Sequence, residues 1–377
     1  MAQSPDVSSE IDYPSLRIQR FSRLERRLAN WPPWVLAFGL LIAVVMKTGL
    51  TFRPRPTDPI DSFPTPRDTY AQLSYGVRTV HWLTQSESPL VPAITAALLF
   101  IVAVGVALVA MKQLPSNGSS RILLIFLLLG PMFTVFVSNL GRPDAFTLTG
   151  GLVLGLLGRT PSWGALGAAL LIAGNPEQAV VSSALLFGLT FLPTMRPWRR
   201  SAAIAISMSC IAFVALAAYA RSVGVGTRVQ YLPELIGNSL YGFTANLSLG
   251  IYAGYSILWL VLAIFAWRLG TGQLLWLSLL MVIIPILITA MTLDQTRVFV
   301  GITTAGISAI LMQTAPCIEE NIRKVSRQLV LVPALAVALF LPAFEVSSDH
   351  VVRPPLAWLY STLMSAISQP AEALLED

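Results

Sequence analysis

Charged residues are scarce in this 377-residue chain, at 12% of the sequence, whereas 55% of its residues are hydrophobic. A soluble globular domain carries about 25% charged residues, so the composition excludes a water-soluble core of this size. The apolar residues form continuous runs and do not alternate with polar ones, which excludes a transmembrane β-barrel. Many of these runs are long enough to cross about 30 Å of hydrocarbon. The sequence therefore predicts a polytopic helical membrane protein.

Cysteine is also rare, because the chain contains only two, and neither has the spacing of a metal ligand. Cys210 lies within an apolar run and Cys317 lies beside a basic loop, so we do not expect a disulfide. The sequence has no Walker-type glycine loop, zinc-ligand spacing, Gly-x-Ser-x-Gly element or dinucleotide-binding fingerprint. These absences argue against ATP hydrolysis, metalloproteolysis and hydride transfer.

The net charge is +6, and the basic residues cluster in short loops between the apolar runs. This pattern indicates topology signals and contacts with lipid headgroups, and we expect no nucleic-acid partner. Residues 1–33 form a polar, basic arm that we place in the cytoplasm. Within this arm, residues 15–28 combine apolar residues at helical spacing with five arginines, which predicts an amphipathic helix on an anionic membrane surface. The first apolar run has no cleavage site after it and is expected to be a retained span.

The expected fold is all-α: a transmembrane bundle over residues 34–345 with nine to eleven crossings. The number is open because the runs 146–157 and 165–174 are shorter than the ~20 residues that a full crossing needs. They are two tilted spans or a hairpin that does not cross. Large outer loops are expected at 51–89 and 221–247, followed by an extracytoplasmic tail at 346–377. The nine longer runs are 34–50, 91–111, 122–140, 179–195, 202–220, 249–267, 274–291, 298–312 and 329–344.

The positive-inside rule fixes the orientation of this bundle. A cytoplasmic N-terminus places every basic cluster of a short turn on the cytoplasmic side, including the loop 317–328 with Arg323 and Lys324. The C-terminus is then extracytoplasmic, and nearly all carboxylates near spans lie on the outer face. We therefore expect a multi-pass protein of the inner or plasma membrane with one polar site on its outer face.

Asp294 and Arg297 are the first candidates for this site, because they lie one helical turn apart between two apolar runs. Ionisable residues at membrane boundaries are costly and point to function. The planar guanidinium of arginine suits phosphate binding, and Asp294 could orient it or bind a sugar hydroxyl.

Arg142 and Asp144 lie in a short turn made rigid by Gly141 and Pro143. A functional pair and a salt bridge that only sets topology explain them equally well. Glu177 follows Asn175-Pro176, a pattern typical of a helix start with a carboxylate in its first turn, so capping explains much of it.

The first outer loop supplies three further candidates. Asp68 follows Pro66 and begins a juxtamembrane helix expected over residues 68–82. The helix dipole stabilises its anion, which could take a proton from a hydroxyl or hold a divalent cation; a plain helix cap is the simpler interpretation. Arg78 and His81 share one face of this helix, and a single histidine without a partner is more often structural.

The order of these features resembles the GT-C superfamily of membrane glycosyltransferases. In both, a cytoplasmic N-terminus and one span precede a long outer loop with an acidic residue before a juxtamembrane helix, and many spans follow. Arg67-Asp68-Thr69-Tyr70 matches an Asp-x-Tyr-like element of that superfamily, and Gly141–Asp144 matches its second acidic position. The first loop lacks an adjacent pair of acids, which leaves the catalytic base and any metal open.

The resemblance implies a polyprenyl-phosphate sugar donor in the membrane and transfer of the sugar to a glycan or lipid acceptor on the extracytoplasmic face. Asp68 would be the general base, and Asp144 would assist it or hold a divalent cation such as Mg²⁺ or Mn²⁺. Arg297, oriented by Asp294, and Arg142 would hold the donor phosphate. Glu177, Arg78 and His81 are further substrate-binding candidates. The alternatives are a polysaccharide polymerase or lipid-linked sugar flippase, and a non-catalytic membrane protein of envelope assembly.

Overall fold

The structure, a computed structural model, is almost entirely helical over the residues that it describes, which confirms the all-α prediction. Two strands of two residues each, β1 (Glu345–Val346) and β2 (Val351–Val352), pair antiparallel. The described residues are 13–49, 75–84, 90–140, 142–222, 240–241, 243–244, 246–292, 294–325, 329–343, 345–346 and 351–352.

The first half of the chain forms short and medium helices, several of which begin at proline. Proline is favoured there because the first helical N–H groups need no partner inside the helix. These elements are α1 (Tyr13–Asn30), α2 (Pro33–Thr48), α3 (Tyr75–Thr84), α4 (Leu90–Met111), α5 (Asn117–Leu128), α6 (Pro131–Ser138), α7 (Asp144–Leu152), the π-helix η3 (Val153–Leu157), α8 (Pro161–Gly174) and α9 (Pro176–Leu189).

The second half contains the longest helix of the described chain, α16 (Gln295–Val325). The other elements are the 3₁₀ helix η4 (Pro193–Trp198), α10 (Arg199–Ser222), α12 (Leu247–Tyr255), α13 (Leu258–Trp267), α14 (Thr271–Ser278), the π-helix η5 (Leu279–Ile283), α15 (Ile284–Ala290) and α17 (Leu331–Phe340).

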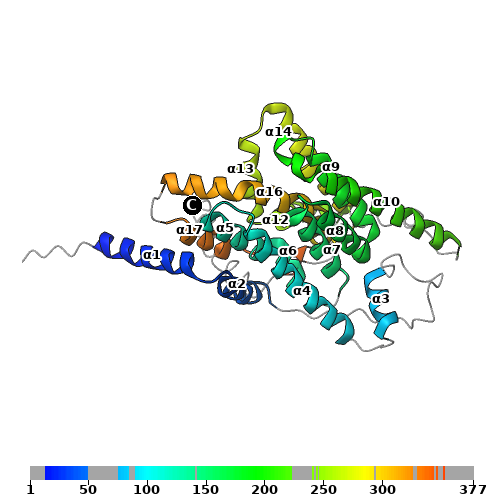
Figure 1. Cartoon of the computed structure of the whole chain (residues 1–377), viewed down its shortest axis with the longest axis horizontal. Coiled ribbons are helices and arrows are strands. Elements are labelled where there is room, and N and C mark those ends of the chain that lie inside the picture. The colour runs from blue at the N-terminus through cyan, green and yellow to red at the C-terminus, as the bar shows by residue number, and fades with distance from the viewer. Residues whose placement is uncertain are drawn as a thin grey trace, which may run out of the picture.

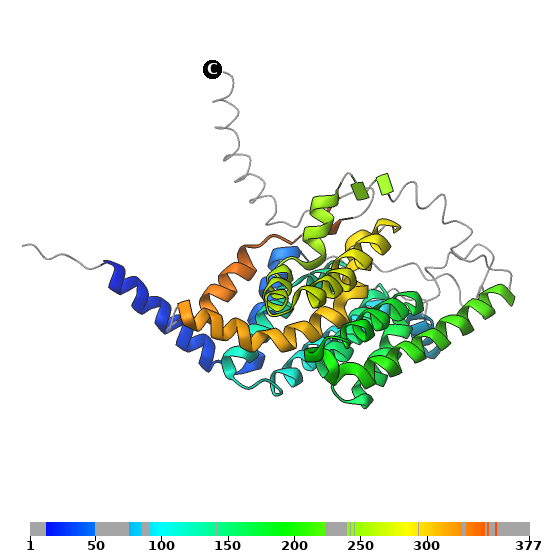
Figure 2. The ribbon, with the colours of Figure 1, turned by 90° about the horizontal axis from the view of Figure 1, so that it is seen from above.

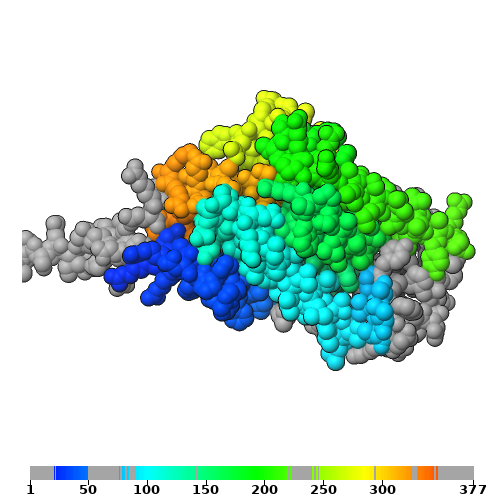
Figure 3. Space-filling model, viewed as in Figure 1, coloured from blue at the N-terminus to red at the C-terminus, as the bar shows by residue number. Residues whose placement is uncertain are grey.

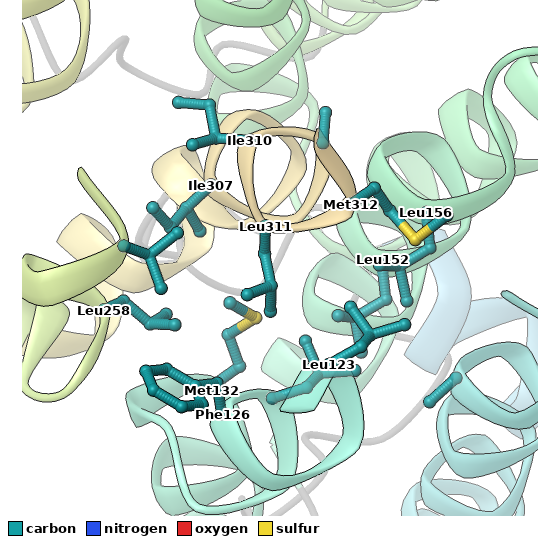
Figure 4. Packing of buried hydrophobic residues seen from close by; sticks show 14 of the residues in the cluster. Leu123, Phe126, Met132, Leu152, Leu156, Leu258, Ile307, Ile310, Leu311 and Met312 are labelled. Carbon is teal, nitrogen blue, oxygen red and sulfur yellow. The ribbon is translucent and has the colours of Figure 1, made fainter. Parts of the chain in front are cut away.

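Helix α16 is the central element of the bundle (Figures 1 and 2). It packs against α5, α7, η3, α9 and α13, and most of its apolar stretch is buried within the protein. Leu311 and Met312 of α16 lie among side chains from these neighbours (Figure 4). Glycine permits the closest of these approaches: a Cβ at Gly151 would lie 2.8 Å from a methyl carbon of Thr304, and one at Gly155 would meet the carbonyl oxygen of Ala305.

Outer helices carry exposed apolar stripes, as expected for surfaces that face lipid. On α2, the side chains of Trp34, Phe38, Ile42 and Met46 recur every four residues, and each is 47–68% exposed. On α4, Leu90, Ile94 and Leu98 repeat this spacing. Figure 3 shows α2 and α4 along one side of the molecule. Apolar surface this extensive is a liability in water, so it supports the prediction of a membrane protein.

Four helical stretches of the described chain are long and apolar enough to span a membrane, and the number rises to seven if each of three bent pairs forms one span. This is fewer than the nine to eleven crossings predicted. Several predicted spans are broken: residues 122–140 bend by 41° between α5 and α6, and residues 249–267 bend by 78° between α12 and α13. Three further apolar helices are short, namely Asp144–Leu157, Pro161–Gly174 and Leu331–Phe340.

The predicted loop at 317–328 is wrong in its first part, because α16 continues to Val325. Ion pairs between Glu319 and Arg323 and between Glu320 and Lys324, one helical turn apart, favour this continuation. Most of the predicted loops 51–89 and 221–247 and of the tail 346–377 lies outside the described residues.

Candidate functional site

The N-termini of α7 and α16 meet at an ionic cluster. Arg297, in the first turn of α16, donates hydrogen bonds from Nε and Nη2 to Oδ2 of Asp144, at 3.1 and 2.6 Å. Its Nη1 donates to Oδ2 of Asp294 at 2.6 Å. The Arg297 and Asp144 side chains are only 10% and 12% exposed, whereas Asp294 is 47% exposed. One guanidinium therefore joins a buried and an exposed carboxylate.

Arg142 completes this cluster from the turn before α7. Its Nη1 lies 4.0 Å from Oδ2 of Asp294, and its side chain is 22% exposed. Asp294 therefore lies between two guanidinium groups. The structure brings together four residues that the sequence singled out in two separate stretches: Arg142, Asp144, Asp294 and Arg297.

A third carboxylate, which the sequence did not single out, lies beside the cluster. Glu345 of β1 is 8% exposed and accepts a hydrogen bond from Nδ2 of Asn139 at 3.1 Å. Its negative charge acts on Arg297 together with those of Asp144 and Asp294. β1 is fastened to α16 because the Val346 N–H donates to the Thr296 hydroxyl at 2.8 Å. The only sequence signal for Glu345 was a carboxylate placed directly after the last apolar run.

Several buried polar atoms at this end of the bundle have no hydrogen-bond partner within the described part of the chain. They are Oδ1 of Asn139, Oε2 of Glu345 and both polar atoms of the Gln295 amide. Buried polar groups are normally paired with protein or ordered water. The site can therefore offer both donors and acceptors to water or to a polar ligand.

The other end of α16 gives a useful contrast. There Glu319, 6% exposed, accepts hydrogen bonds from the hydroxyls of Ser116 and Ser119 and from two nitrogens of Arg323. Both of its oxygens are paired, and the network joins the start of α5 to the end of α16. This second cluster has the character of a structural joint, whereas the cluster around Arg297 keeps unpaired polar atoms.

Glu177 lies in the first turn of α9, as predicted. The Asn175 side chain caps this helix, because its Oδ1 accepts from the backbone N–H groups of Glu177 and Gln178 at 3.0 and 3.2 Å. Gln178 in turn lies over Gly301, where a Cβ would be 2.6 Å from its Oε1. Gly301 is one turn beyond Arg297 on α16, so α9 begins at the same end of the bundle as the ionic cluster.

Within the juxtamembrane segment predicted as a helix over 68–82, the structure confirms a helix from Tyr75 as α3 (Tyr75–Thr84), which carries Arg78 and His81, and residues 68–74 lie outside the described part. Gly76 of α3 packs on Phe146 of α7, where a Cβ would lie 2.8 Å from the ring. Phe146 is two residues beyond Asp144, and residues two apart do not share a helix face, so this contact joins α3 to the first turn of α7 without placing α3 at the ionic cluster. The side chains of Arg78 and His81, and all of Asp68, lie outside the described part of the structure.

The described residues contain no group of three or more His, Cys, Asp and Glu side chains arranged to hold a metal ion. The divalent cation stays a prediction. Comparisons of the chain with protein families, with curated proteins and with solved structures found no match.

Proposed function

We propose that this protein is an integral membrane glycosyltransferase that moves a sugar from a polyprenyl-phosphate donor to an acceptor hydroxyl at the extracytoplasmic face. The observation that carries the proposal is the arrangement of Arg297 between Asp144 and Asp294. It joins the two outer turns that the resemblance to GT-C enzymes assigns to catalysis and to phosphate binding. The product would be a cell-envelope polysaccharide or glycolipid.

The exposure of each member of the cluster suggests its role. Three N–H donors of Arg297 are directed at carboxylates, so Arg297 fixes the positions of Asp144 and Asp294 and adds positive charge to the site. Arg142 is more exposed and stands beside Asp294, which suits contact with the donor phosphate and stabilisation of the charge that develops as it leaves. Asp294 is the most exposed carboxylate of the three that we place here and can accept a hydrogen bond from a sugar hydroxyl.

Asp68 is the proposed general base that deprotonates the acceptor hydroxyl. The contact of Gly76 in α3 with Phe146 in α7 supports this role, because the chain enters α3 only seven residues after Asp68 and α7 is the helix that begins at Asp144. Asp144 would assist the base or hold a divalent cation. Glu177, Arg78 and His81 belong to the surrounding substrate-binding surface.

The proposal includes an orientation for the bundle. The ends of α13 and α16 that carry Arg268, Arg323 and Lys324 come together, because Nη1 of Arg268 contacts the Cys317 sulfur at 2.6 Å. The ionic cluster lies at the opposite end of α16. This separation supports a cytoplasmic basic end and an extracytoplasmic site. The chain would be a multi-pass inner- or plasma-membrane protein with a cytoplasmic N-terminus and an extracytoplasmic C-terminus.

The test uses purified protein in nanodiscs and a panel of radiolabelled polyprenyl-monophosphate hexoses and pentoses. Release of polyprenyl phosphate reports turnover even when water is the acceptor, and added envelope glycans report transfer. We expect Asp68→Asn to abolish turnover while donor binding is retained, and Glu320→Gln, an exposed carboxylate at the other end of α16, to leave turnover unchanged. Movement of a lipid-linked sugar across a vesicle membrane, without turnover and independent of Asp68, would instead identify a flippase.

A further inference from the structure

Helix α1 meets α2 at a sharp bend next to the membrane-spanning bundle. The axes of residues 23–30 and of α2 differ in direction by 111°. Because α2 exposes an apolar stripe along its length, as a lipid-facing helix does, we place α2 through the bilayer. Helix α1 then lies close to the plane of the membrane surface, projecting away from the bundle (Figure 1).

Two side chains fasten α1 in this position. The Glu25 carboxylate accepts hydrogen bonds of 2.7–2.9 Å from the backbone N–H groups of Val330, Leu331 and Val332, at the start of α17. Arg121 of α5 donates to the carbonyl oxygens of Leu28 and Trp31, at 2.9 and 2.6 Å. Both contacts complement the partial charges of helix ends. α1 is therefore a fixed part of the fold.

Between Phe21 and Leu28, one face of α1 is apolar, and its two ends have different surroundings. Phe21, Leu24 and Leu28 lie three and four residues apart, so they share that face. Leu28 is 3% exposed because it packs on the bundle, whereas Phe21 and Leu24 are 48% and 41% exposed. Protein covers one end of the apolar stripe, and in the described structure the other end is exposed.

The residues around this stripe match the chemistry of a membrane surface. Arg23, Arg26 and Arg27 are exposed on α1, and Trp31 and Trp34 are 39% and 66% exposed at the bend. Tryptophan is enriched at the level of lipid headgroups. Helices with an apolar face and arginines beside it lie in this layer and are attracted by anionic lipids.

We infer that α1 is a surface helix that binds anionic phospholipid headgroups. Phe21 and Leu24 enter the boundary between headgroups and acyl chains, and Arg23, Arg26 and Arg27 contact lipid phosphates. Glu25 and Arg121 tie α1 to α17 and α5, so the lipid-binding helix is anchored to the membrane bundle. The inference concerns the surface opposite to the ionic cluster and does not depend on glycosyl transfer.

The position of α1 is tested by measuring the depth of spin labels in the full-length protein. The labels are placed by Leu24→Cys, Arg26→Cys and Phe38→Cys, each in a Cys210→Ser, Cys317→Ser background, and the protein is reconstituted in nanodiscs of phosphatidylcholine with phosphatidylglycerol. We expect the spin label at position 24 to be more accessible to oxygen, which dissolves in lipid, than to a water-soluble nickel reagent, as at the lipid-facing reference position 38. The label at position 26 should be more accessible to the nickel reagent. Equal exposure of 24 and 26 to the nickel reagent would overturn the proposal.

The choice of lipid is tested by native mass spectrometry of bound phosphatidylglycerol. Removal of three arginines near an anionic surface is expected to weaken lipid binding by roughly tenfold or more, so Arg23→Gln, Arg26→Gln and Arg27→Gln are combined. The matched control combines Arg196→Gln, Arg199→Gln and Arg200→Gln, which make the same charge change elsewhere. The lysine triple variant at 23, 26 and 27 should retain most binding. Equal losses in the two glutamine variants, or no loss in the first, would contradict a specific role for α1.

Discussion

Arg297 and Asp144 are 153 residues apart in the chain, yet two nitrogens of the guanidinium donate to one carboxylate oxygen at 2.6 and 3.1 Å. The pair is largely buried at the end of the bundle where α7 and α16 begin. An ion pair in such a place needs both partners, because either one alone is a buried, uncompensated charge. The pair thus stabilises this end of the protein, and substitutions of its members and neighbours should lower the stability by different amounts.

Arg297→Gln should be strongly destabilising, because it leaves Asp144 buried without its counter-charge at a cost of about 3–5 kcal/mol. Asp294→Asn removes a half-exposed partner and should cost about 1 kcal/mol or less. Thermal unfolding of the nanodisc-embedded protein, followed by tryptophan fluorescence, measures both. In a double-mutant cycle, the variant with both Arg297→Gln and Asp144→Asn should lose less stability than the sum of the losses in the two single variants. Additive losses would show that the two side chains do not interact.

Arg142→Gln should weaken use of the donor and leave the fold intact, because its side chain is more exposed than that of Arg297. If Arg142 contacts the donor phosphate, kcat/KM for the polyprenyl-phosphate sugar should fall by about 10²-fold, the effect typical of losing one donor to a developing negative charge. Exposed Arg196 provides the matched control as Arg196→Gln. An unchanged kcat/KM would remove Arg142 from the site.

Asn139→Ala should destabilise the protein more than Glu345→Gln does. The first change removes the hydrogen bond to Glu345 and leaves a buried carboxylate without it, which costs about 1–3 kcal/mol. The second keeps the size of the side chain and removes only its charge. Unfolding curves of the two variants give the comparison, and a larger loss for Glu345→Gln would mean that its charge, and not the hydrogen bond, holds β1 in place.

Gly155→Ala should cost about 1–3 kcal/mol, because the new methyl group would meet the backbone of α16 at Ala305, which cannot move aside cheaply. Gly105→Ala on α4 is the control, since no atom apart from the adjoining backbone of α4 itself lies within 4 Å of its added Cβ. There the better helix propensity of alanine should raise stability by about 0.5–1 kcal/mol. Equal effects of the two substitutions would contradict the close packing of η3 on α16.

The sequence predicted the helical membrane class and the grouping of four charged residues better than it predicted where the helices bend and end. Hydropathy locates the ends of the predicted spans, and the basic residues assign each end to one side of the membrane. Together they predict one shared face for Arg142, Asp144, Asp294 and Arg297. Hydropathy describes composition and not direction, so it does not reveal the bend at Ser256, whose backbone has a positive φ of 46°. The sequence does not reveal Glu345 as a site residue, because its position depends on contacts between distant parts of the chain. Asn139, 206 residues away, donates a hydrogen bond to it, and the N–H of the next residue, Val346, donates to Thr296 at the start of α16.

We propose that the cluster around Arg297 is the catalytic end of a membrane glycosyltransferase. The most direct measurement is the rate at which the nanodisc-embedded protein releases polyprenyl phosphate from a radiolabelled polyprenyl-monophosphate sugar, compared between the unaltered protein, Asp144→Asn and the control Glu320→Gln. We predict that turnover falls by about 10²-fold or more in Asp144→Asn and is unchanged in Glu320→Gln. Equal turnover in all three proteins, or none in the unaltered protein with any donor of the hexose and pentose panel, would contradict the claim.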